Sequence, residues 1–297
     1  MAKSWREIRQ SLEYAAVCGA LALAARLPID AGQRVGAAVG RFAFDVVRMR
    51  RAVSIDNIVK SLGVSEKEAT RIARASYMNS GRCLLEFSAF ARLSPAEILD
   101  LVAIEGRENL QRVLAEGKGG IIAAAHLGNW ELCGAALTAI GTPLSFLVGQ
   151  QTNSRVDDVM NDLRRKQNIG IIKRNVALRG VMQALAANQI VAILPDQDAR
   201  KNGIMIEFLG RPASTVKGPA IFAIRRKCAV LPVFIARQGT RHLMTIEPPL
   251  YAIEGADEDA RVRDLTQRYT DRFSARVRQH PTEYFWGHRR WKTQSTG

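Results

Sequence analysis

The 297-residue chain is predicted to form an α/β fold, with a central sheet of mixed direction and helices on both faces. From about residue 101 onward, short apolar runs alternate with segments of helical periodicity, which is the order typical of α/β sheets. The run 121–125 is one such buried strand, followed by a glycine-containing turn and a predicted helix. With 47% hydrophobic residues and no internal repeat, the chain can bury a large core.

The first 47 residues are predicted to form a helical membrane anchor that precedes one folded domain over residues 48–297. Residues 14–27 (YAAVCGALALAARL) are strongly apolar except for Arg26. This run is shorter than the roughly 20 residues that a spanning helix needs. We therefore expect the segment either barely to span a membrane or to lie in its interface, with an alanine-rich pair of core helices as the alternative. The basic run at 48–51 (RMRR) favours contact with anionic lipid.

Two capping boxes mark helix starts before the α/β region. Ser65 with Glu68 opens a helix predicted to reach about Phe90, and Ser94 with Glu97 opens a second one. The later elements are assigned from their periodicity and from glycine or proline at their ends. The predicted strands are 101–105, 121–125, 144–148, 190–194, 229–235 and 243–246, with 204–208 as an edge strand or hairpin arm. The predicted helices are 108–115, 130–140, 156–167, 178–187, 217–227 and 260–279.

Charge is the strongest compositional feature, with 43 Lys and Arg against 28 Asp and Glu, a net charge of +15 and a pI of about 10.3. Such an excess suits nucleic acid, an anionic membrane surface, or an acidic partner or substrate. Aromatic residues make up only 6%, which is few for a protein that stacks bases, and no nucleic-acid-binding motif occurs. We therefore expect no nucleic-acid partner.

The cysteines and histidines give no sign of a metal or disulfide site. Four of each are scattered along the chain, with no CxxC, HExxH or close cluster. The Walker A and GxGxxG motifs of nucleotide-binding loops are also missing from the sequence. We expect neither a metal nor a cofactor.

Polar residues follow two of the buried strands, at the edge where ligands gather in open α/β sheets. The sequence HLGNWE (126–131) follows the run 121–125. On one straight helix His126 and Glu131 would lie about 140° apart, so they can meet only if His126 ends the strand and Glu131 starts the helix. A carboxylate there can orient an imidazole that acts as a base. Asp196 and Gln197 follow the run 190–194 and form a second cluster.

No covalent nucleophile is indicated. GxSxG is absent, and Cys133 lies inside a predicted helix with no activating neighbour. A histidine base without a nucleophile fits direct attack by a substrate hydroxyl or by water. Four arginines are candidates to hold phosphate or to stabilise an oxyanion: Arg164, Arg211, Arg289 and Arg290.

Four motifs together resemble one enzyme family. HLGNWE resembles the H-x4-D/E motif of the glycerolphosphate and lysophospholipid acyltransferase superfamily, and the wider pattern resembles its lipid A biosynthesis branch, the late (lauroyl/myristoyl-type) acyltransferases. Residues 50–57 are similar to that branch's basic stretch ending in Asn. Residues 210–215 (GRPAST) resemble its G-R-x-A-x-T loop. Residues 281–291 (PTEYFWGHRRW) resemble its P-E-x-Y-x-W-x-H-R-R ending, with Thr282 as a departure.

The resemblance implies a glycerolphosphate-acyltransferase-like fold and an enzyme of the bacterial inner membrane whose catalytic domain faces the cytoplasm. It implies transfer of a fatty acyl chain from an acyl carrier protein or coenzyme A thioester to a hydroxyl of an anionic glycolipid, a lipid A precursor, without a covalent intermediate. In this reading His126 is the base, Glu131 orients it, Arg164 faces the oxyanion and Asp196 fixes neighbouring groups. The expected substrate-binding residues are Asn129, Gln197, Arg211, Thr215, Glu283, His288, Arg289 and Arg290.

Three alternatives remain open at this point. The acceptor is another glycolipid, such as a phosphatidylinositol mannoside or an aminolipid; or the His–Glu pair activates water and the protein is a hydrolase; or the protein is a basic nucleic-acid or membrane-surface binding protein. The last alternative accounts for the charge but leaves HLGNWE and the apolar N-terminal run unexplained.

Overall fold

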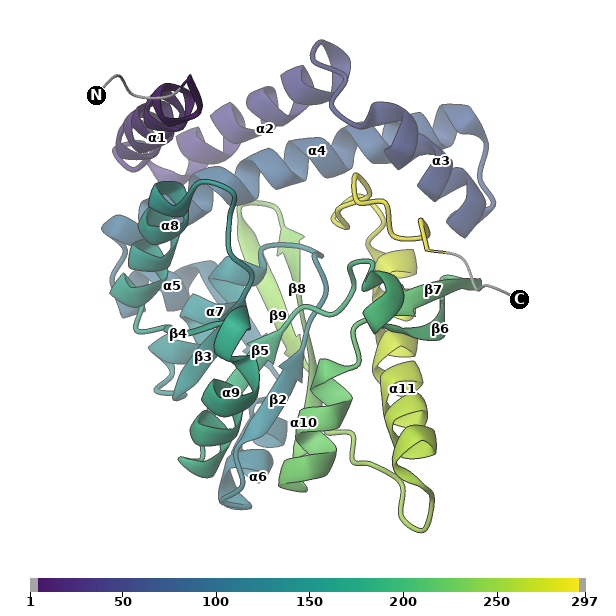
Figure 1. Cartoon of the computed structure of the whole chain (residues 1–297). Helices are drawn as coiled ribbons and strands as arrows, with labels where there is room; N and C mark the ends of the chain where they lie inside the picture. The colour runs from purple at the N-terminus through teal and green to yellow at the C-terminus, as the bar shows by residue number, and fades with distance from the viewer. Residues whose placement is uncertain (1–4, 294–297) are drawn as a thin grey trace.

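A seven-stranded sheet forms the centre of the protein in a computed structural model that describes residues 5–293 (Figure 1). Its strands are β1 (Val102–Glu105), β2 (Gly120–Ala123), β3 (Leu144–Val148), β4 (Gly170–Lys173), β5 (Ile190–Ile193), β8 (Ala229–Gln238) and β9 (Arg241–Ile246). The strand order is β1-β9-β8-β2-β5-β3-β4. All neighbours pair in parallel except β8 and β9, which form an antiparallel hairpin. The predicted sheet of mixed direction is confirmed.

Helices cover both faces of this sheet. One face carries α5 (Pro95–Leu101), α6 (Arg107–Ala115), α7 (Trp130–Ala139) and α8 (Ser154–Lys166); the other carries α9 (Ala177–Ala186), α10 (Gly218–Arg226) and α11 (Glu258–Gln279). Strand β2 contributes side chains to the cores on both faces of the sheet, because Ile121 and Ala123 pack into one core and Ile122 into the other. A strand buried on both sides is apolar throughout, which explains its uninterrupted sequence.

Two strands were not predicted from the sequence. Residues 210–215, expected as a loop, contain β7 (Arg211–Thr215), which pairs with β6 (Ile204–Phe208) in a separate two-stranded hairpin. Leu209 and Gly210 form its two-residue turn, and both have positive φ (55° and 80°), as tight hairpin turns require. Pro212 is tolerated because the hairpin has free edges. Strand β4 has only four residues between two helices, too few for a clear period.

Four helices form a layer across one end of the sheet (Figure 1). They are α1 (Trp5–Ala24), α2 (Ile29–Asp45), α3 (Arg51–Leu62) and α4 (Glu66–Ser88). The connection between α1 and α2 is held by the Arg92 guanidinium, which donates to the carbonyls of Ala25 and Leu27 at 2.7 and 2.8 Å. The Asn153 side chain donates to the Gln10 carbonyl at 2.9 Å and ties α1 to the start of α8.

The expectation of a membrane-spanning N-terminal helix is not supported. Within residues 5–293, no helix is long and apolar enough to cross a membrane. Charged residues occupy the first half of α1, so its apolar run stays short.

Helices α2 and α4 approach each other at a row of glycines. A Cβ added to Gly36 would lie 2.4 Å from the carbonyl oxygen of Gly81, and one added to Gly40 would lie 2.0 Å from that of Tyr77. Both obstacles are backbone atoms, which cannot rotate away. The helices can therefore pack at this distance only with glycine at these positions.

Substitution of Gly40 by Ala tests this packing. The added methyl group must push the two helices apart, and we expect the free energy of unfolding to fall by about 1–3 kcal/mol, with a lower midpoint of thermal unfolding. Gly19→Ala in α1 is the matched control, because a Cβ there meets nothing within 4 Å. Equal unfolding midpoints for the two variants would contradict the close approach.

Candidate active site

The turn between β2 and α7 carries His126 at the end of the sheet. A Cβ on Gly128 would lie 1.9 Å from the carbonyl oxygen of Ile235, and its φ is +62°, so the turn requires glycine. The C-terminal segment fixes the turn from outside: Phe285 N–H donates to the His126 carbonyl at 2.9 Å, and Gly128 N–H donates to the Glu283 carbonyl at 3.1 Å. The predicted order of strand, turn and helix is confirmed.

The carboxylate that contacts His126 is Asp196. Its Oδ1 lies 2.7 Å from His126 Nδ1, and its Oδ2 accepts the His126 backbone N–H at 2.9 Å. With Nδ1–H donated to Asp196, the other ring nitrogen, Nε2, is left as the proton acceptor. The His126 side chain is 20% exposed and that of Asp196 only 2%, so a substrate can reach the imidazole but not the carboxylate.

This pair shifts the pKa values of both groups. Burial lowers the pKa of His126, but the charge and hydrogen bond of Asp196, with a further contribution from the charge of Glu131, outweigh it and raise the pKa above 6.5. Burial raises the pKa of Asp196, but the charge and hydrogen bonds of His126 outweigh it and lower the pKa below 3.8. The histidine therefore stabilises the folded state below pH 6.5, and this contribution is lost as pH rises through its raised pKa.

Glu131, expected to orient His126, is instead paired with Arg164. Arg164 Nε donates to Glu131 Oε2 at 2.9 Å and Nη2 to Oε1 at 2.5 Å, while Nη1 donates to Asn161 at 2.7 Å. The first turn of α7 faces the last turn of α8, which brings this arginine to Glu131 and leaves His126 to Asp196. Among the described residues, these contacts use three of the five guanidinium N–H groups, and two remain to donate elsewhere.

Gln197 also reaches the imidazole. Its amide nitrogen lies 3.3 Å from His126 Nε2, the nitrogen on the exposed side of the ring. An amide N–H donated to the neutral imidazole satisfies Nε2. The Trp130 ring packs edge-on against the imidazole with 4.8 Å between ring centroids and restrains it from a further side.

A cavity of about 400 Å³ opens beside His126. Glu131, Arg164 and Gln197 also line it, so its polar groups converge at one place. The rest of its wall combines apolar side chains with polar ones. The apolar ones come from the ends of β3 and β5 and from α8 (Phe146, Leu147, Val148, Met160, Ile193 and Leu194), and the polar ones are Gln150, Gln151, Arg174 and Asp198. A cavity in which polar groups converge beside apolar side chains is the usual form of a small-molecule site. Cys133 offers no nucleophile here, since burial raises its pKa to about 12.

Several residues predicted to bind substrate have structural contacts and do not line this cavity. Asn129 caps α7, where its side chain accepts the Leu132 N–H at 3.0 Å and donates to Glu86 at 2.7 Å. Arg290 is buried and its Nη2 donates to Thr215 Oγ1 at 2.5 Å. Arg211 stacks on Trp291 with 4.3 Å between guanidinium and ring centre.

The other predicted residues lie in three different settings. Arg289 is exposed. His288 lies near the His126–Asp196 pair, and burial lowers its pKa while the charge of Asp196 partly opposes this. Glu283 lines a second cavity, which is described below. The sequence reasoning missed Tyr284, whose pKa is raised well above 10.0 by burial and by the neighbouring Asp196 carboxylate. Only its place in the C-terminal motif could have indicated it.

The distant motifs meet around the C-terminal segment. Asn57 Nδ2 donates to the carbonyls of Trp286 and His288, both at 2.9 Å, and Arg50 donates to that of Gly287 at 3.2 Å. Arg290 donates to the Ser214 carbonyl in β7. The basic stretch ending at Asn57 and the GRPAST sequence therefore hold residues 286–290, and the adjoining residues 283–285 pair with the His126 turn.

Comparison with known proteins agrees with this arrangement. The family model of bacterial lipid A biosynthesis acyltransferases matches residues 2–293. The lipid A biosynthesis palmitoleoyltransferase of Escherichia coli (strain K12) is 23% identical over 286 residues, which are 94% of this chain and 90% of that protein. The lipid A biosynthesis lauroyltransferase of the same organism is 24% identical over 286 residues, with 94% and 91% covered.

A phosphatidylinositol mannoside acyltransferase of Mycobacterium tuberculosis is also similar, with 25% identity over 193 residues. The match covers 64% of this chain and spans 59% of the length of the mycobacterial protein. Because the family model covers almost the whole chain, the protein belongs to the bacterial lipid A biosynthesis acyltransferase family.

Proposed function

We propose that the protein transfers a fatty acyl group from a thioester to a hydroxyl of an anionic glycolipid, with His126 as general base. The observation that carries the proposal is the Asp196–His126 pair, in which Asp196 takes Nδ1–H and leaves Nε2 as the proton acceptor of an imidazole that lines a cavity with apolar side chains. The apolar side chains of the wall suit a fatty acyl chain, and within residues 5–293 no activated nucleophile lies beside His126, which favours direct transfer.

In the proposed reaction, His126 Nε2 removes the proton of the acceptor hydroxyl as its oxygen attacks the thioester carbonyl. The tetrahedral intermediate collapses with cleavage of the carbon–sulfur bond, which leaves the acyl group on the acceptor oxygen as an ester. The imidazolium then returns its proton to the departing thiolate. Asp196 holds the ring in the required tautomer and stabilises its protonated form.

The developing oxyanion needs donors, and two side chains of the cavity can supply them. Arg164 retains two N–H groups beyond those bound to Glu131 and Asn161, and its pairing fixes the guanidinium in place. The Gln197 amide already lies next to Nε2. In this proposal Glu131 acts through Arg164 as a positioning residue, and it also supplies negative charge near the imidazolium.

We propose a lipid A precursor as the acceptor and an acyl carrier protein or coenzyme A thioester as the donor. The two enterobacterial relatives, which match over most of their length, favour this acceptor class. The net charge of +15 suits both an acidic carrier protein and an anionic lipid. A phosphatidylinositol mannoside is the second candidate acceptor, because the mycobacterial acyltransferase is equally similar over a shorter range.

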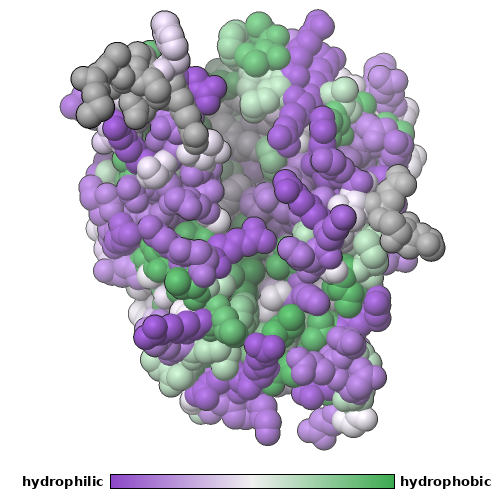
Figure 2. Space-filling view, viewed as in Figure 1, coloured by the Kyte–Doolittle hydropathy of each residue, from purple (hydrophilic) through white to green (hydrophobic). Residues whose placement is uncertain are grey.

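The outer face of α2 supports attachment to the surface of a membrane, which we propose is the cytoplasmic side of the bacterial inner membrane. Val35, Val39, Phe42 and Val46 recur at intervals of three and four residues, and all are exposed. Apolar side chains gather at the top of the face shown in Figure 2, above the end of α2. Arginines next to this stripe, at 34, 41 and 48, suit anionic headgroups.

Substitution of His126 by Ala removes the proposed base. We expect the rate of acyl transfer to fall by about 10²–10⁴-fold. The assay quantifies both the acylated glycolipid and free fatty acid from an acyl carrier protein thioester, so that it separates transfer from hydrolysis. His280→Ala, at the end of α11, is the matched control. A near-normal rate for His126→Ala would overturn the assignment, and free fatty acid as the main product would favour the hydrolase.

Substitution of Asp196 by Asn tests the pairing through pH. The base must be neutral, so the wild-type rate should rise with pH through a pKa above 6.5. The variant loses the charge that raises this pKa but keeps the burial that lowers it. The rise of the acyl-transfer rate with pH should therefore occur at lower pH. The plateau rate should fall by at least about 10²-fold, because the tautomer is no longer fixed. Asp162→Asn, on the exposed face of α8, is the control and should change neither the pH at which the rate rises nor the plateau rate. If the rate of Asp196→Asn rises at the same pH as that of the wild type, the pairing is refuted.

Substitution of Phe42 by Ser tests membrane attachment. Phe42 is 57% exposed, and its transfer into the lipid interface should contribute about 1.5–3 kcal/mol, so the variant should bind vesicles at least about tenfold more weakly. Sedimentation with phosphatidylcholine–phosphatidylglycerol vesicles measures this. Ile253→Ser, an exposed apolar residue between β9 and α11, should bind as the wild type does. Unchanged binding of Phe42→Ser would exclude α2 as the contact.

A further inference from the structure

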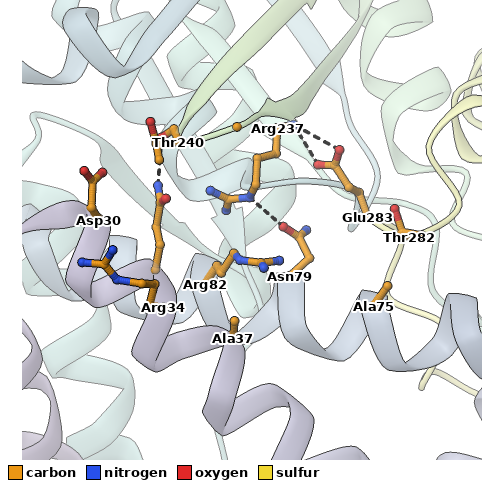
Figure 3. A pocket seen from close by; sticks show the side chains of 12 residues that line it. Asp30, Arg34, Ala37, Ala75, Asn79, Arg82, Arg237, Thr240, Thr282 and Glu283 are labelled. Atoms are coloured by element: carbon orange, nitrogen blue, oxygen red, sulfur yellow. Dashed lines mark hydrogen bonds between the residues drawn. The ribbon is translucent and has the colours of Figure 1, made fainter.

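A second cavity, of about 640 Å³, lies between α2, α4, the turn joining β8 to β9 and the C-terminal segment (Figure 3). It shares no lining residue with the cavity beside His126. The proposed transfer reaction gives it no role. Five charged side chains line it: Asp30, Arg34, Arg82, Arg237 and Glu283. Figure 3 shows Arg82 and Arg237 on the side of Asn79, and Arg34 extending toward Asp30.

Arg237 is held rigidly in this cavity. Its Nη1 and Nη2 donate to the two oxygens of Glu86 at 2.6 and 3.0 Å, and its Nε donates to Asn79 at 3.0 Å. The pair is almost fully buried, with 10% of the Arg237 side chain and 4% of that of Glu86 exposed. Nη2 also donates to Cys83 Sγ at 3.9 Å, so one N–H group, on Nη1, is left to donate into the cavity, and Glu86 balances the charge of the guanidinium from behind.

The charge of Arg82 is not compensated by a carboxylate in this way. Within residues 5–293 its guanidinium has no hydrogen bond or ion pair, although it is half-buried in the wall next to Arg237. Burial and the positive charge of Arg237 lower the pKa of Arg82, and the charge of Glu86 opposes this only in part. Two guanidinium groups that share a cavity repel each other, and an anion between them removes the repulsion and accepts their N–H groups. Exposed Arg34 adds a third cation at the rim.

The acidic groups define the other half of the site. The Glu283 carboxylate accepts the Arg237 backbone N–H at 3.1 and 3.0 Å, and as an acceptor of up to four hydrogen bonds it has capacity for ligand hydroxyls. Asp30 lies on α2, one turn before Arg34. These carboxylates repel a bare anion, so the cavity matches a group that carries both a negative charge and several hydroxyls. Phosphorylated and carboxylated sugars have this chemistry.

We propose that this cavity binds the anionic sugar headgroup of a membrane glycolipid, with its phosphate or carboxylate between Arg82 and Arg237 and its hydroxyls toward Glu283. One face of α2 lines the cavity with Asp30, Gln33, Arg34 and Ala37, and the exposed apolar stripe lies on the opposite face of the same helix. The wall at Glu283 belongs to the segment that holds the His126 turn. The proposal deepens the proposed function and rests on it, because the bound headgroup is that of the acceptor.

Calorimetric titration of the full chain with glucose 1-phosphate, inorganic phosphate and glucose tests the site. We expect glucose 1-phosphate to bind with a Kd of about 1 mM or tighter, and the other two to bind at least about tenfold more weakly. Arg82→Gln should weaken binding of glucose 1-phosphate at least about tenfold, and Arg34→Gln should also weaken it. Arg225→Gln, an exposed arginine in the last turn of α10, should bind as the wild type does.

A competition experiment distinguishes a lipid headgroup from a free sugar phosphate. Vesicles that contain a phosphorylated inositol lipid should displace glucose 1-phosphate, whereas phosphatidylglycerol vesicles, which lack a sugar, should not. Failure of the inositol lipid to displace it would overturn the headgroup assignment. Equal binding by wild type and Arg82→Gln, or inorganic phosphate binding as tightly as the sugar phosphate, would overturn the site. If Arg82→Gln does not fold, the binding of glucose 1-phosphate by Arg34→Gln, a substitution at the exposed rim, takes its place as the test of the site.

The same titration on His126→Ala separates this proposal from the catalytic one. The variant should bind glucose 1-phosphate unchanged, because His126 does not line this cavity. Binding without acyl transfer in the wild type would leave the site standing and the proposed reaction refuted. Acyl transfer without any binding of the sugar phosphate would leave the reaction standing and remove the site.

Discussion

One buried carboxylate, that of Glu86 in α4, connects α4 with α2, with the start of α7 and with strands β8 and β9. It accepts hydrogen bonds from Gln33 at 2.7 Å, Asn129 at 2.7 Å and Arg237 at 2.6 and 3.0 Å, and His242 Nε2 lies 3.2 Å away. A carboxylate can accept about four hydrogen bonds, so Glu86 is saturated. Burial alone would raise its pKa, but the hydrogen bonds of His242 and Arg237 lower it to about 2. The group is therefore charged throughout the physiological pH range, and loss of any one donor leaves a buried charge less compensated.

The hydrogen bonds of Glu86 fix residues next to both cavities. On one side Glu86 fixes Asn129, the cap of α7, and thereby the helix that begins with Trp130 and Glu131 beside the imidazole. On the other side it fixes Arg237 in the wall of the second cavity. Buried charge pairs of this kind are weak sources of net stability, because desolvation offsets the attraction. Their effect here is geometric, since they hold the α7 cap and the Arg237 guanidinium in fixed relation.

The sequence predicted the sheet and the place of His126 after a strand because both depend on local patterns. An apolar run that ends in a glycine turn places His126 at the sheet edge whatever the rest of the chain does. The choice of its partner is not local. Glu131 lies five residues away and Asp196 seventy, and only the packing of α7 against α8, which gives Glu131 to Arg164, decides between them. The β6–β7 hairpin was missed because GRPAST has the composition of a loop, although its turn geometry makes a strand of it.

Several residues of the family motifs bind other segments of the protein and do not line the cavity beside His126. Asn57 and Thr215 match family patterns and bind residues 286–290, and Arg290 binds β7; none of the three lines the cavity beside His126. Their placement has a physical reason, because the His126 turn pairs with residues 283–285 and not with a strand of the central sheet. That C-terminal segment is irregular and is held in part by side chains, among them Ser76, which donates to the Tyr284 carbonyl. The position of His126, the proposed base, therefore depends on a chain of hydrogen bonds that begins in α3 and β7.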